Sequence, residues 1–171
     1  MEAIYFLKGM RVGIRHLRPE DLSELLQLEQ DPVVMTYING GYPLPSEEVE
    51  ERLSRAINFY NDFPGLGKFA VCMLDDDRFL GWACLQPLDN TEEIELGYRL
   101  HQHTWGKGIA TEASKLLCNY YFHTLMRERL VAITRHDNFA SRKVIEKTGL
   151  HYEKEATFYN TEVLYYSLDK E

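Results

Sequence analysis

Hydrophobic and polar positions change period several times along the chain, which predicts alternating strands and helices. Residues 11–18 alternate between apolar and polar side chains, as a half-buried strand does. Pro19 suits a first helical position and opens an expected helix over residues 20–30, whose leucines form one apolar stripe. Asp21 lies in the first turn of this helix, where the helix dipole favours a negative charge.

The middle of the chain predicts a loop, a helix and a β-hairpin. Residues 37–45 are rich in Gly and Pro, and Ser46 is the expected N-cap of a helix with one apolar face as far as Tyr60. Residues 68–74 and 78–85 have the composition of paired strands joined by an acidic turn. The remaining elements are expected strands over residues 92–100, 129–134, 150–156 and 162–168, and expected helices over residues 106–124 and 141–148.

The length and the element order favour one domain. A chain of 171 residues is long enough for a single hydrophobic core, and no repeat or linker divides it. The elements follow the order β-α-α-β-β-β-α-β-α-β-β. This order predicts one α/β domain over residues 1–171 with a mixed central β-sheet.

Composition and cysteine content favour a cytoplasmic protein. Hydrophobic residues make up 44% of the chain and charged residues 27%, which is ordinary for a globular domain. The longest apolar run, residues 69–74, is far shorter than the roughly 20 residues that cross a membrane. Residues 1–10 lack the features of a signal peptide. Cys72, Cys84 and Cys118 form no C-x-x-C pair and are expected to be buried thiols, which suits a reducing compartment.

The net charge of −8 argues against a general nucleic-acid binder, because neutralising phosphates requires a clustered basic surface. A negative field attracts cationic substrates such as amines and polyamines, although many soluble bacterial proteins are simply acidic. The charge therefore permits an amine substrate without selecting one.

A glycine-bearing turn between a strand and a helix is the most informative segment. Residues 92–100 lead into Gly106 and Gly108, which open the expected helix over residues 106–124. The first N–H groups of a helix have no internal partner and lie at the positive end of its dipole. Glycine lets this backbone approach a ligand closely. The turn is therefore expected to bind an anion such as a pyrophosphate.

Two common phosphate-binding patterns do not fit this turn. The Walker pattern G-x-x-x-x-G-K-[ST] fails because Gly108 follows Lys107 and because His101 occupies the first glycine position. The dinucleotide pattern G-x-G-x-x-[GA] fails at Thr111. Glu128 lies at the distance expected of a ribose-binding acid, but it precedes the next strand. The third option is the pyrophosphate turn of acyl-CoA-binding enzymes.

Three segments resemble the GNAT superfamily of acyl-CoA N-acyltransferases. The turn His103-Thr104-Trp105-Gly106-Lys107-Gly108 is similar to that family's [QR]-x-x-G-x-[GA] and departs from it at His103. Residues 138–150 resemble N-x-x-S-x-x-[VL]-x-x-[KR]-x-G-[FL] in the branch of ribosomal-protein N-terminal (alanine) acetyltransferases. Residues 15–21 are similar to the start of these domains. The resemblance covers nearly the whole chain in the expected element order.

The resemblance implies acetyl-CoA as co-substrate, no metal, and helices on both faces of the sheet. It also implies that the fourth and fifth strands splay apart to admit the acyl chain. N–H groups near Tyr98 to Leu100 would orient the thioester carbonyl, and Asn138 would bind the pantetheine amides or cap its helix. The full set of implied contacts is Tyr98, Arg99, Leu100, His103, Gly106, Lys107, Gly108, Ile109, Ala110, Thr111, Asn138 and Ser141.

The expected chemistry is direct attack of a primary amine on the thioester. A protonated amine cannot attack, so a base is needed. Glu95 is the first candidate, on one strand face with Gly97 and Arg99, although an ion-paired or solvent-facing Glu95 stays open; His103 is the second candidate. Ser141 is the candidate acid, because no tyrosine stands three residues beyond it, where many relatives have one. No cysteine is expected in the site, which disfavours a covalent enzyme intermediate.

The sequence leaves other functions and the acceptor open. A non-catalytic acyl-CoA-binding or regulatory module would keep the turn without the base, and a nucleotide-phosphate binder would bind ATP in competition with CoA. The acceptor is expected to be a small-molecule or peptide amine: a protein N-terminus, a polyamine, an amino acid or an aminoglycoside. Residues 33–45 and 158–161 are expected to shape its site. The expected state is a monomer or homodimer without a nucleic-acid or membrane partner.

Overall fold

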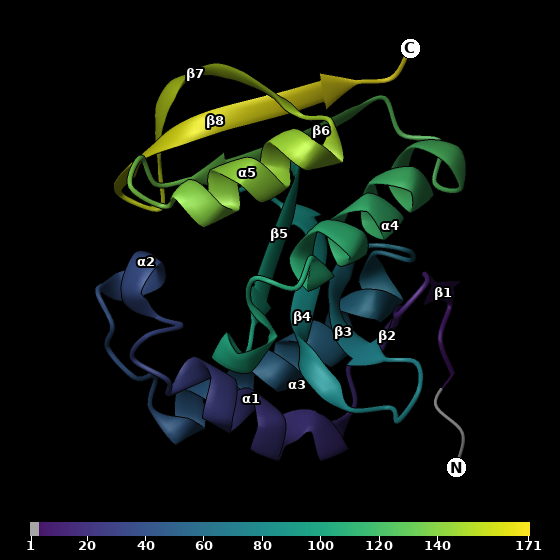
Figure 1. Ribbon diagram of the computed structural model, residues 1–171, viewed down its shortest axis with the longest axis vertical. Helices are drawn as coiled ribbons and strands as arrows, with labels where there is room; N and C mark the ends of the chain where they lie inside the picture. The colour runs from purple at the N-terminus through teal and green to yellow at the C-terminus, as the bar shows by residue number, and fades with distance from the viewer. Residues whose placement is uncertain (1–3) are drawn as a thin grey trace.

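Within residues 4–171, eight strands form one sheet in the order β1-β2-β3-β4-β5-β6-β8-β7 (Figure 1). The computed structural model describes residues 4–171. The strands are β1 (Leu7–Lys8), β2 (Val12–His16), β3 (Gly67–Met73), β4 (Phe79–Pro87), β5 (Ile94–Leu100), β6 (Arg129–Thr134), β7 (His151–Phe158) and β8 (Thr161–Asp169). Every neighbouring pair is antiparallel except β5 and β6, so the sheet is mixed, as the sequence predicts.

The parallel strands β5 and β6 separate almost as soon as they pair. Glu95 is in register with Val131, and no other register pair joins these strands in the described part of the chain. β5 continues along β4, whereas β6 continues along β8. An opening therefore develops between the two halves of the sheet (Figure 1). This opening confirms the predicted splay between the fourth and fifth strands of the sequence analysis, which are β5 and β6.

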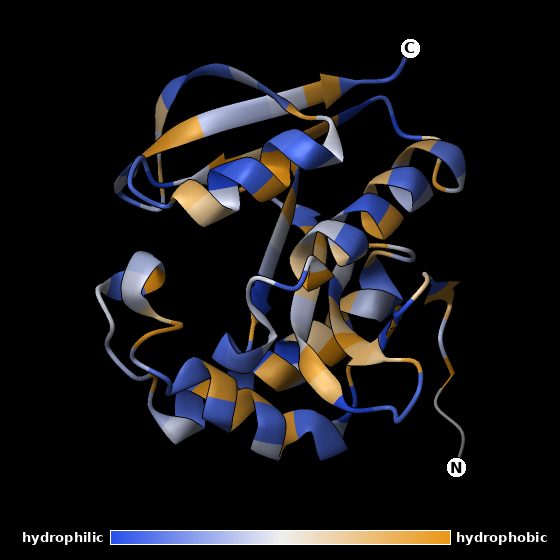
Figure 2. Cartoon of the chain, viewed as in Figure 1, coloured by the Kyte–Doolittle hydropathy of each residue, from blue (hydrophilic) through white to orange (hydrophobic). Residues whose placement is uncertain are grey.

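Helices cover both faces of the sheet, as the resemblance implies. They are α1 (Leu22–Glu29), α2 (Thr36–Asn39), α3 (Ser46–Asp62), α4 (Ile109–His123) and α5 (Phe139–Thr148). α4 and α5 pack on one face, and α1 and α3 pack on the other. Hydrophilic and hydrophobic residues alternate along these helices, as expected of helices with one side on the sheet (Figure 2). Among residues 4–171, no helix has both the length and the apolar character needed to cross a membrane.

β3 and β4 are mostly apolar because each of their faces is buried in a separate core. On β3 and β4, Val71 and Ala83 belong to the core beneath α4, whereas Cys72 and Trp82 belong to the core beneath α1 and α3. A strand buried on both faces has a continuous apolar run instead of an alternating one. This explains the apolar run over residues 69–74.

The N-terminal half contains two short elements that the sequence did not predict, β1 and α2. Most of α2 falls inside the expected loop over residues 37–45. Ser46 is also not an N-cap: it is the first residue of α3, and Pro45 precedes it as the cap. The Ser46 hydroxyl instead accepts a hydrogen bond from Gln30 Nε2 at 3.1 Å. The prediction for Ser46 was wrong because a partner distant in sequence competes for its hydroxyl.

Two helices in the C-terminal half begin at other residues than expected. α4 begins after Gly108 instead of at Gly106, because both glycines adopt the left-handed conformation and lie outside the helix. α5 begins at Phe139, two residues before Ser141, because the Asn138 side chain caps it.

A buried ion pair joins β2 to the short 3-10 turn Pro19–Asp21. Arg15 donates two hydrogen bonds of 2.8 Å to Asp21, which also accepts the Arg18 N–H at 2.8 Å. The side chains of Arg15 and Asp21 are 8% and 7% exposed. Asp21 therefore neutralises a buried guanidinium, a stronger role than the dipole contact that its position in the sequence suggests.

Replacing Asp21 by Asn should destabilise the fold by about 3–5 kcal/mol, because Arg15 would stay buried without a counter-charge. Urea denaturation followed by tryptophan fluorescence measures the change. Asp75→Asn is the matched control, since Asp75 is exposed, and it should shift stability by less than about 0.5 kcal/mol. Equal stabilities of the two variants would contradict the structural role of the buried pair.

Candidate active site

The glycine turn and the start of α4 leave several backbone N–H groups free. Gly106 (φ 73°) and Gly108 (φ 77°) are left-handed, and Gly108 is the N-cap of α4. Ile109, Ala110 and Thr111 form the first turn, and the N–H of Glu112 is the first to bond back, to the Gly108 oxygen at 3.0 Å. Within residues 4–171, the N–H groups of residues 107–111 have no protein acceptor. They lie at the positive end of the helix dipole and are free to bind an anion.

Arg11 and Glu112 fix this turn to β2, a contact that sequence reasoning missed. Arg11 Nη1 donates to the Lys107 oxygen at 2.7 Å, and Arg11 Nε donates to Glu112 Oε2 at 2.9 Å. Glu112 Oε1 accepts the N–H groups of Arg11 and Val12 at 2.7 and 3.1 Å. Burial alone would raise the pKa of Glu112, but these hydrogen bonds hold it below its usual value. No local sequence pattern predicts this contact, because its partners are about a hundred residues apart.

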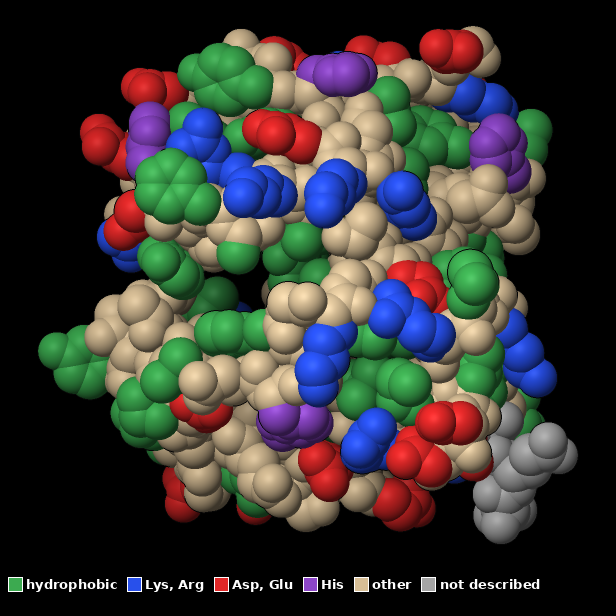
Figure 3. All heavy atoms as spheres, in the orientation of Figure 1, with side chains coloured by type: hydrophobic (Ala, Val, Ile, Leu, Met, Phe, Trp, Pro, Cys, Tyr) green, Lys and Arg blue, Asp and Glu red, His purple; other side chains and the backbone are tan. Residues whose placement is uncertain are grey.

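A basic surface surrounds the turn although the chain as a whole is acidic. Figure 3 shows Lys and Arg side chains gathered over α5 and around the start of α4, on both sides of a hollow. Lys107 is exposed in the turn, and Arg142 and Lys143 lie on α5. Positive side chains on both sides of the hollow suit a ligand that contains phosphates.

The N–H groups of β5 alternate between β4 and the opening. The His101 N–H donates to the Leu80 oxygen, next to β4, at 2.9 Å. Because successive N–H groups along a strand point in opposite directions, the N–H of Arg99 also faces β4. Those of Tyr98 and Leu100 face the opening. Tyr98 and Leu100 thus stay candidate donors for a thioester carbonyl, whereas the backbone of Arg99 provides no donor there.

Asn138 and Ser141 lie at the start of α5. Asn138 Oδ1 accepts the Ser141 N–H at 3.2 Å, so Asn138 caps the helix. Its side-chain NH₂ has no partner within residues 4–171 and is free for a ligand. Burial raises the pKa of the Tyr98 phenol, and the nearby Ser141 side chain opposes the increase. The fold therefore brings a tyrosine from β5 to Ser141, although none stands three residues beyond Ser141 in the sequence.

Glu95 is a buried carboxylate on the face of β5 opposite α4, and it is 8% exposed. Its Oε1 accepts hydrogen bonds from the Tyr159 hydroxyl at 2.9 Å and from Gln86 Nε2 at 3.3 Å. Burial raises the pKa of Glu95, and these two hydrogen bonds oppose the increase. Glu95 is thus neither solvent-facing nor ion-paired within the described residues. A carboxylate with a raised pKa suits proton acceptance near neutral pH.

Tyr159 comes from the turn between β7 and β8, and sequence reasoning did not identify it. Tyr159 and Asn160 are left-handed, with φ of 50° and 56°. Asn tolerates this conformation, whereas a residue as bulky as Tyr rarely adopts it. Asp89 holds the turn: its N–H donates to the Tyr159 hydroxyl, and its carboxylate accepts the Tyr159 N–H, each at 2.8 Å. The turn therefore positions a hydroxyl group on Glu95.

Cys84 lies in the site, contrary to the expectation that no cysteine does. Its Sγ is 3.2 Å from the position that a Cβ on Gly97 would take. Burial raises the pKa of this thiol to about 12, so it stays protonated at neutral pH. Cys72 and Cys118 are buried free thiols as well, as the sequence predicts.

His103, the second candidate base, lies apart from Glu95. It is exposed, and its ring stacks on His101 with 5.4 Å between centroids. Both histidines line an open cavity of about 470 Å³. No hydrogen bond or ion pair joins His103 to Glu95 among residues 4–171, so the two candidate bases lie in separate surroundings.

Residues 11–151 match the family model described as an acetyltransferase (GNAT) domain. The chain belongs to the GNAT acetyltransferase family. It is similar to the uncharacterized N-acetyltransferase p20 of Bacillus licheniformis, with 30% identity over 91% of this chain and 84% of that protein. The membership confirms the resemblance seen in the sequence and makes the chain an N-acetyltransferase.

Solved structures show that the fold is shared with other acetyltransferases. An acetyltransferase from Agrobacterium tumefaciens str. C58 has a TM-score of 0.83 at 24% identity, and the match covers 99% of both chains. RimL, a ribosomal L7/L12 alpha-N-protein acetyltransferase solved in complex with Coenzyme A, has a TM-score of 0.76 at 17% identity. That match covers 94% of this chain and 95% of RimL.

In this GNAT domain, Gly106→Ala should weaken CoA binding by roughly tenfold or more. A Cβ at Gly106 meets no protein atom within 4 Å, so it would project into the space expected for the pyrophosphate. Gly40→Ala is the matched control, since Gly40 is also left-handed (φ 86°) and its Cβ would meet only Tyr42, at 3.6 Å. Both variants should lose about 1–2 kcal/mol of stability. Calorimetric titration with CoA would contradict the predicted cradle if both variants bound equally well.

Tyr159→Phe should raise the pKa of Glu95 further, because the lost hydrogen bond stabilises the charged carboxylate. Carbon-13 NMR titration of the Glu95 carboxyl measures this pKa directly. Tyr152→Phe is the control, since Tyr152 lies on β7 and is 56% exposed. If Glu95 is the base in this GNAT enzyme, the acidic limb of its rate–pH profile moves to higher pH in Tyr159→Phe alone. An unchanged Glu95 titration would refute the proposed effect of Tyr159.

Proposed function

We propose that this enzyme moves the acetyl group of acetyl-CoA onto a primary amine by direct attack, with Glu95 as the general base. The opening between β5 and β6 is the observation on which the proposal rests. β5 contains Glu95 near its start and Tyr98 and Leu100, with their free N–H groups, near its end. The glycine turn follows β5 in the chain. Base, carbonyl-binding donors and anion site thus follow one another along the opening.

The glycine turn and α5 would hold acetyl-CoA, which supplies an activated acetyl thioester. The free N–H groups of residues 107–111 suit its pyrophosphate, and the free side-chain NH₂ of Asn138 suits the pantetheine amides. The basic side chains on both sides of the hollow add favourable charge. RimL shares this fold and was solved with Coenzyme A, which supports the choice of co-substrate.

Glu95 has one oxygen available to accept a proton. Tyr159 and Gln86 both bond to Oε1, while Oε2 has no hydrogen bond within residues 4–171. Glu95 would take a proton from the amine, directly or through a water, so that the amine can attack. The N–H groups of Tyr98 and Leu100 would stabilise the negative charge that develops on the carbonyl oxygen, and one such donor contributes about 3–4 kcal/mol in other enzymes.

Ser141 would donate a proton to the departing thiolate, with the Tyr98 phenol beside it as a second donor. A serine hydroxyl is a weak acid, but a thiolate is a good leaving group that needs little assistance. Cys84 stays protonated and buried, so a covalent acetyl-enzyme on this thiol is disfavoured. The amine nitrogen therefore bonds directly to the acetyl carbon, and the carbon–sulfur bond then breaks, without an enzyme-bound acetyl group.

A non-catalytic acyl-CoA-binding module would keep the cradle but would not need a buried, oriented carboxylate. Glu95 and its two hydrogen-bond donors therefore favour the catalytic alternative. The acceptor is proposed to be a small-molecule or peptide amine. The single domain over residues 1–171, the cytoplasmic location and the monomeric or homodimeric state stay predictions from the sequence.

Glu95→Gln should lower kcat by ~10²–10⁴-fold, the usual contribution of a general base, and should leave acetyl-CoA affinity nearly unchanged. Thiol release over an amine panel measures kcat, and calorimetry measures affinity. Glu92→Gln is the matched control, because Glu92 is exposed near the start of the same strand. Turnover of Glu95→Gln within about threefold of wild type would remove Glu95 from the mechanism, since that change is far below the general-base range.

A further inference from the structure

The face of the sheet opposite α4 bears two cations on one aromatic ring. Lys68 Nζ lies 4.1 Å, and the Arg99 guanidinium carbon 4.9 Å, from the centroid of the Trp82 ring. Glu29 from α1 accepts the Trp82 Nε1–H at 2.9 Å and forms an ion pair with Arg99. The Glu29 carboxylate therefore contacts Trp82 and Arg99 directly, in a cluster that contains the two positive charges of Lys68 and Arg99.

Hydrogen-bond donors outnumber acceptors in this cluster. Each oxygen of Glu29 already has one donor, from Trp82 on Oε1 and from Arg99 on Oε2. Arg99 is 9% exposed, and its Nε is buried without a partner in the described part of the chain. The Lys68 ammonium, which has three donors, makes no hydrogen bond or ion pair within residues 4–171. Lys68 is half-buried, whereas Arg99 Nε is fully buried. A buried donor without a partner is costly, so Arg99 Nε beside the Lys68 charge points to an acceptor supplied from outside the chain.

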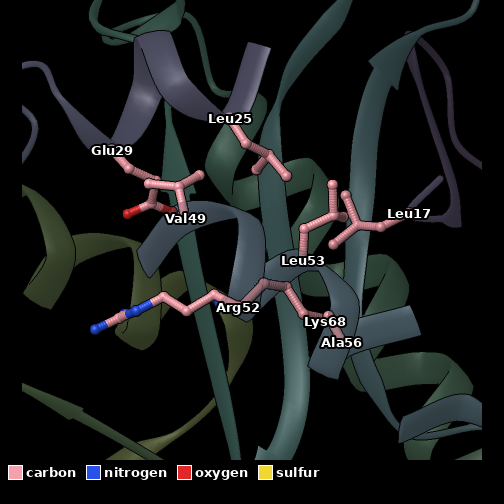
Figure 4. A pocket seen from close by; sticks show the side chains of 8 residues that line it. All are labelled: Leu17, Leu25, Glu29, Val49, Arg52, Leu53, Ala56 and Lys68. Carbon is pink, nitrogen blue, oxygen red and sulfur yellow. The ribbon is translucent and has the colours of Figure 1, made fainter. Parts of the chain in front are cut away.

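A small cavity lies beside Lys68, between α1, α3 and β3 (Figure 4). Its volume is about 10 Å³, enough for about one water-sized group. Leu17 and Leu25 line one side, while the Glu29 carboxylate and the Arg52 guanidinium extend away from them. Burial lowers the pKa of Lys68 to about 8, so most of the ammonium is charged at neutral pH. The cavity thus provides a positive charge in a confined space.

Glu95 lies on the same face of the sheet as this cluster. The part of that face from Glu95 past Gly97 and Cys84 to Lys68 and Arg99 is called the strip below. Lys68 is in register with Cys84, and Cys84 with Gly97, which is two residues from Glu95. Strand geometry places the Cα atoms of Lys68 and Glu95 about 10 Å apart across the strands and about 7 Å apart along them. Gly97 stands between Glu95 and Arg99 on this face and adds no side chain. The strip therefore has a negative end and a positive end.

We propose that Lys68 and Arg99 bind a carboxylate of the acceptor, and that the acceptor is a zwitterionic amine such as a free amino acid. This proposal rests on the proposed function, because it assigns the amino end of the acceptor to Glu95. The carboxylate supplies the hydrogen-bond acceptors that the Lys68 ammonium and Arg99 Nε lack. The two ends of the strip then match the two charges of one small molecule.

The same charges disfavour the other acceptor classes. A polyamine or an aminoglycoside would bring further positive charge towards Lys68 and Arg99, where burial strengthens the repulsion. A protein N-terminus without a nearby carboxylate would leave the buried Arg99 Nε unpaired. A zwitterion alone satisfies both ends of the strip.

Comparing free amino acids with their own carboxamides tests this proposal, with thiol release as the readout at saturating acetyl-CoA. Wild type should prefer the acid, and Lys68→Met should reduce the acid-to-amide ratio of kcat/KM by about 10- to 100-fold, the contribution of a hydrogen bond to a charged group. Lys115→Met is the matched control, since Lys115 is exposed on α4, and it should leave the ratio unchanged. Thermal stabilisation by CoA confirms that each variant is folded.

Three results would overturn the proposal. Wild type could turn over the amides as well as the acids, or could prefer spermidine or an aminoglycoside to every amino acid. Alternatively, Lys68→Met could slow acids and amides equally, as expected if only a buried water or packing contact is lost.

Failure of the proposed function would look different, because no amine would release thiol. Calorimetric titration of the CoA-bound protein with N-acetyl amino acids and N-acetyl amino amides then tests the carboxylate site by itself. Tighter binding of the acid, lost in Lys68→Met, supports the site without catalysis. Equal affinity of the acid and the amide for wild type refutes it.

Discussion

The single register pair between Glu95 and Val131 is the constraint on which the site depends. If β5 and β6 stayed paired, the N–H groups of Tyr98 and Leu100 would bond to β6, since buried backbone groups rarely stay unpaired. The core that includes Leu96, Leu130 and residues of α4 and α5 holds the two halves of the sheet together instead. The parted strands therefore expose backbone donors while a shared core still joins the two halves of the sheet.

Alternation along β5 would place the two proposed substrates on opposite faces of the sheet. Tyr98 faces the layer of α4 and α5, where the glycine turn and Ser141 lie. Glu95 and Arg99 face the layer of α1 and α3, where Glu29 pairs with Arg99. Two ligands that approach from opposite faces meet only where the strands part. This arrangement suits direct transfer, because neither substrate has to leave before the other enters.

The sequence predicted the features that depend on local periodicity and failed where partners are distant. The element order, the mixed sheet and the glycine turn follow from residues near one another in the chain. Tyr159, by contrast, reaches Glu95 across 64 positions, and Trp82 reaches Glu29 across 53. Cys84 enters the site only through strand register with Gly97. Such contacts are set by sheet topology, so no local pattern reveals them.

The contact between Arg11 and Glu112 orders the glycine turn before any ligand arrives. Ordering a backbone residue costs roughly 1–2 kcal/mol of conformational entropy, and here folding has already imposed that order. Association therefore retains more of its interaction energy as affinity, which is the benefit of preorganisation. A substitution in β2, about a hundred residues from the turn in sequence, would then lower ligand affinity although the substituted residue contacts no ligand.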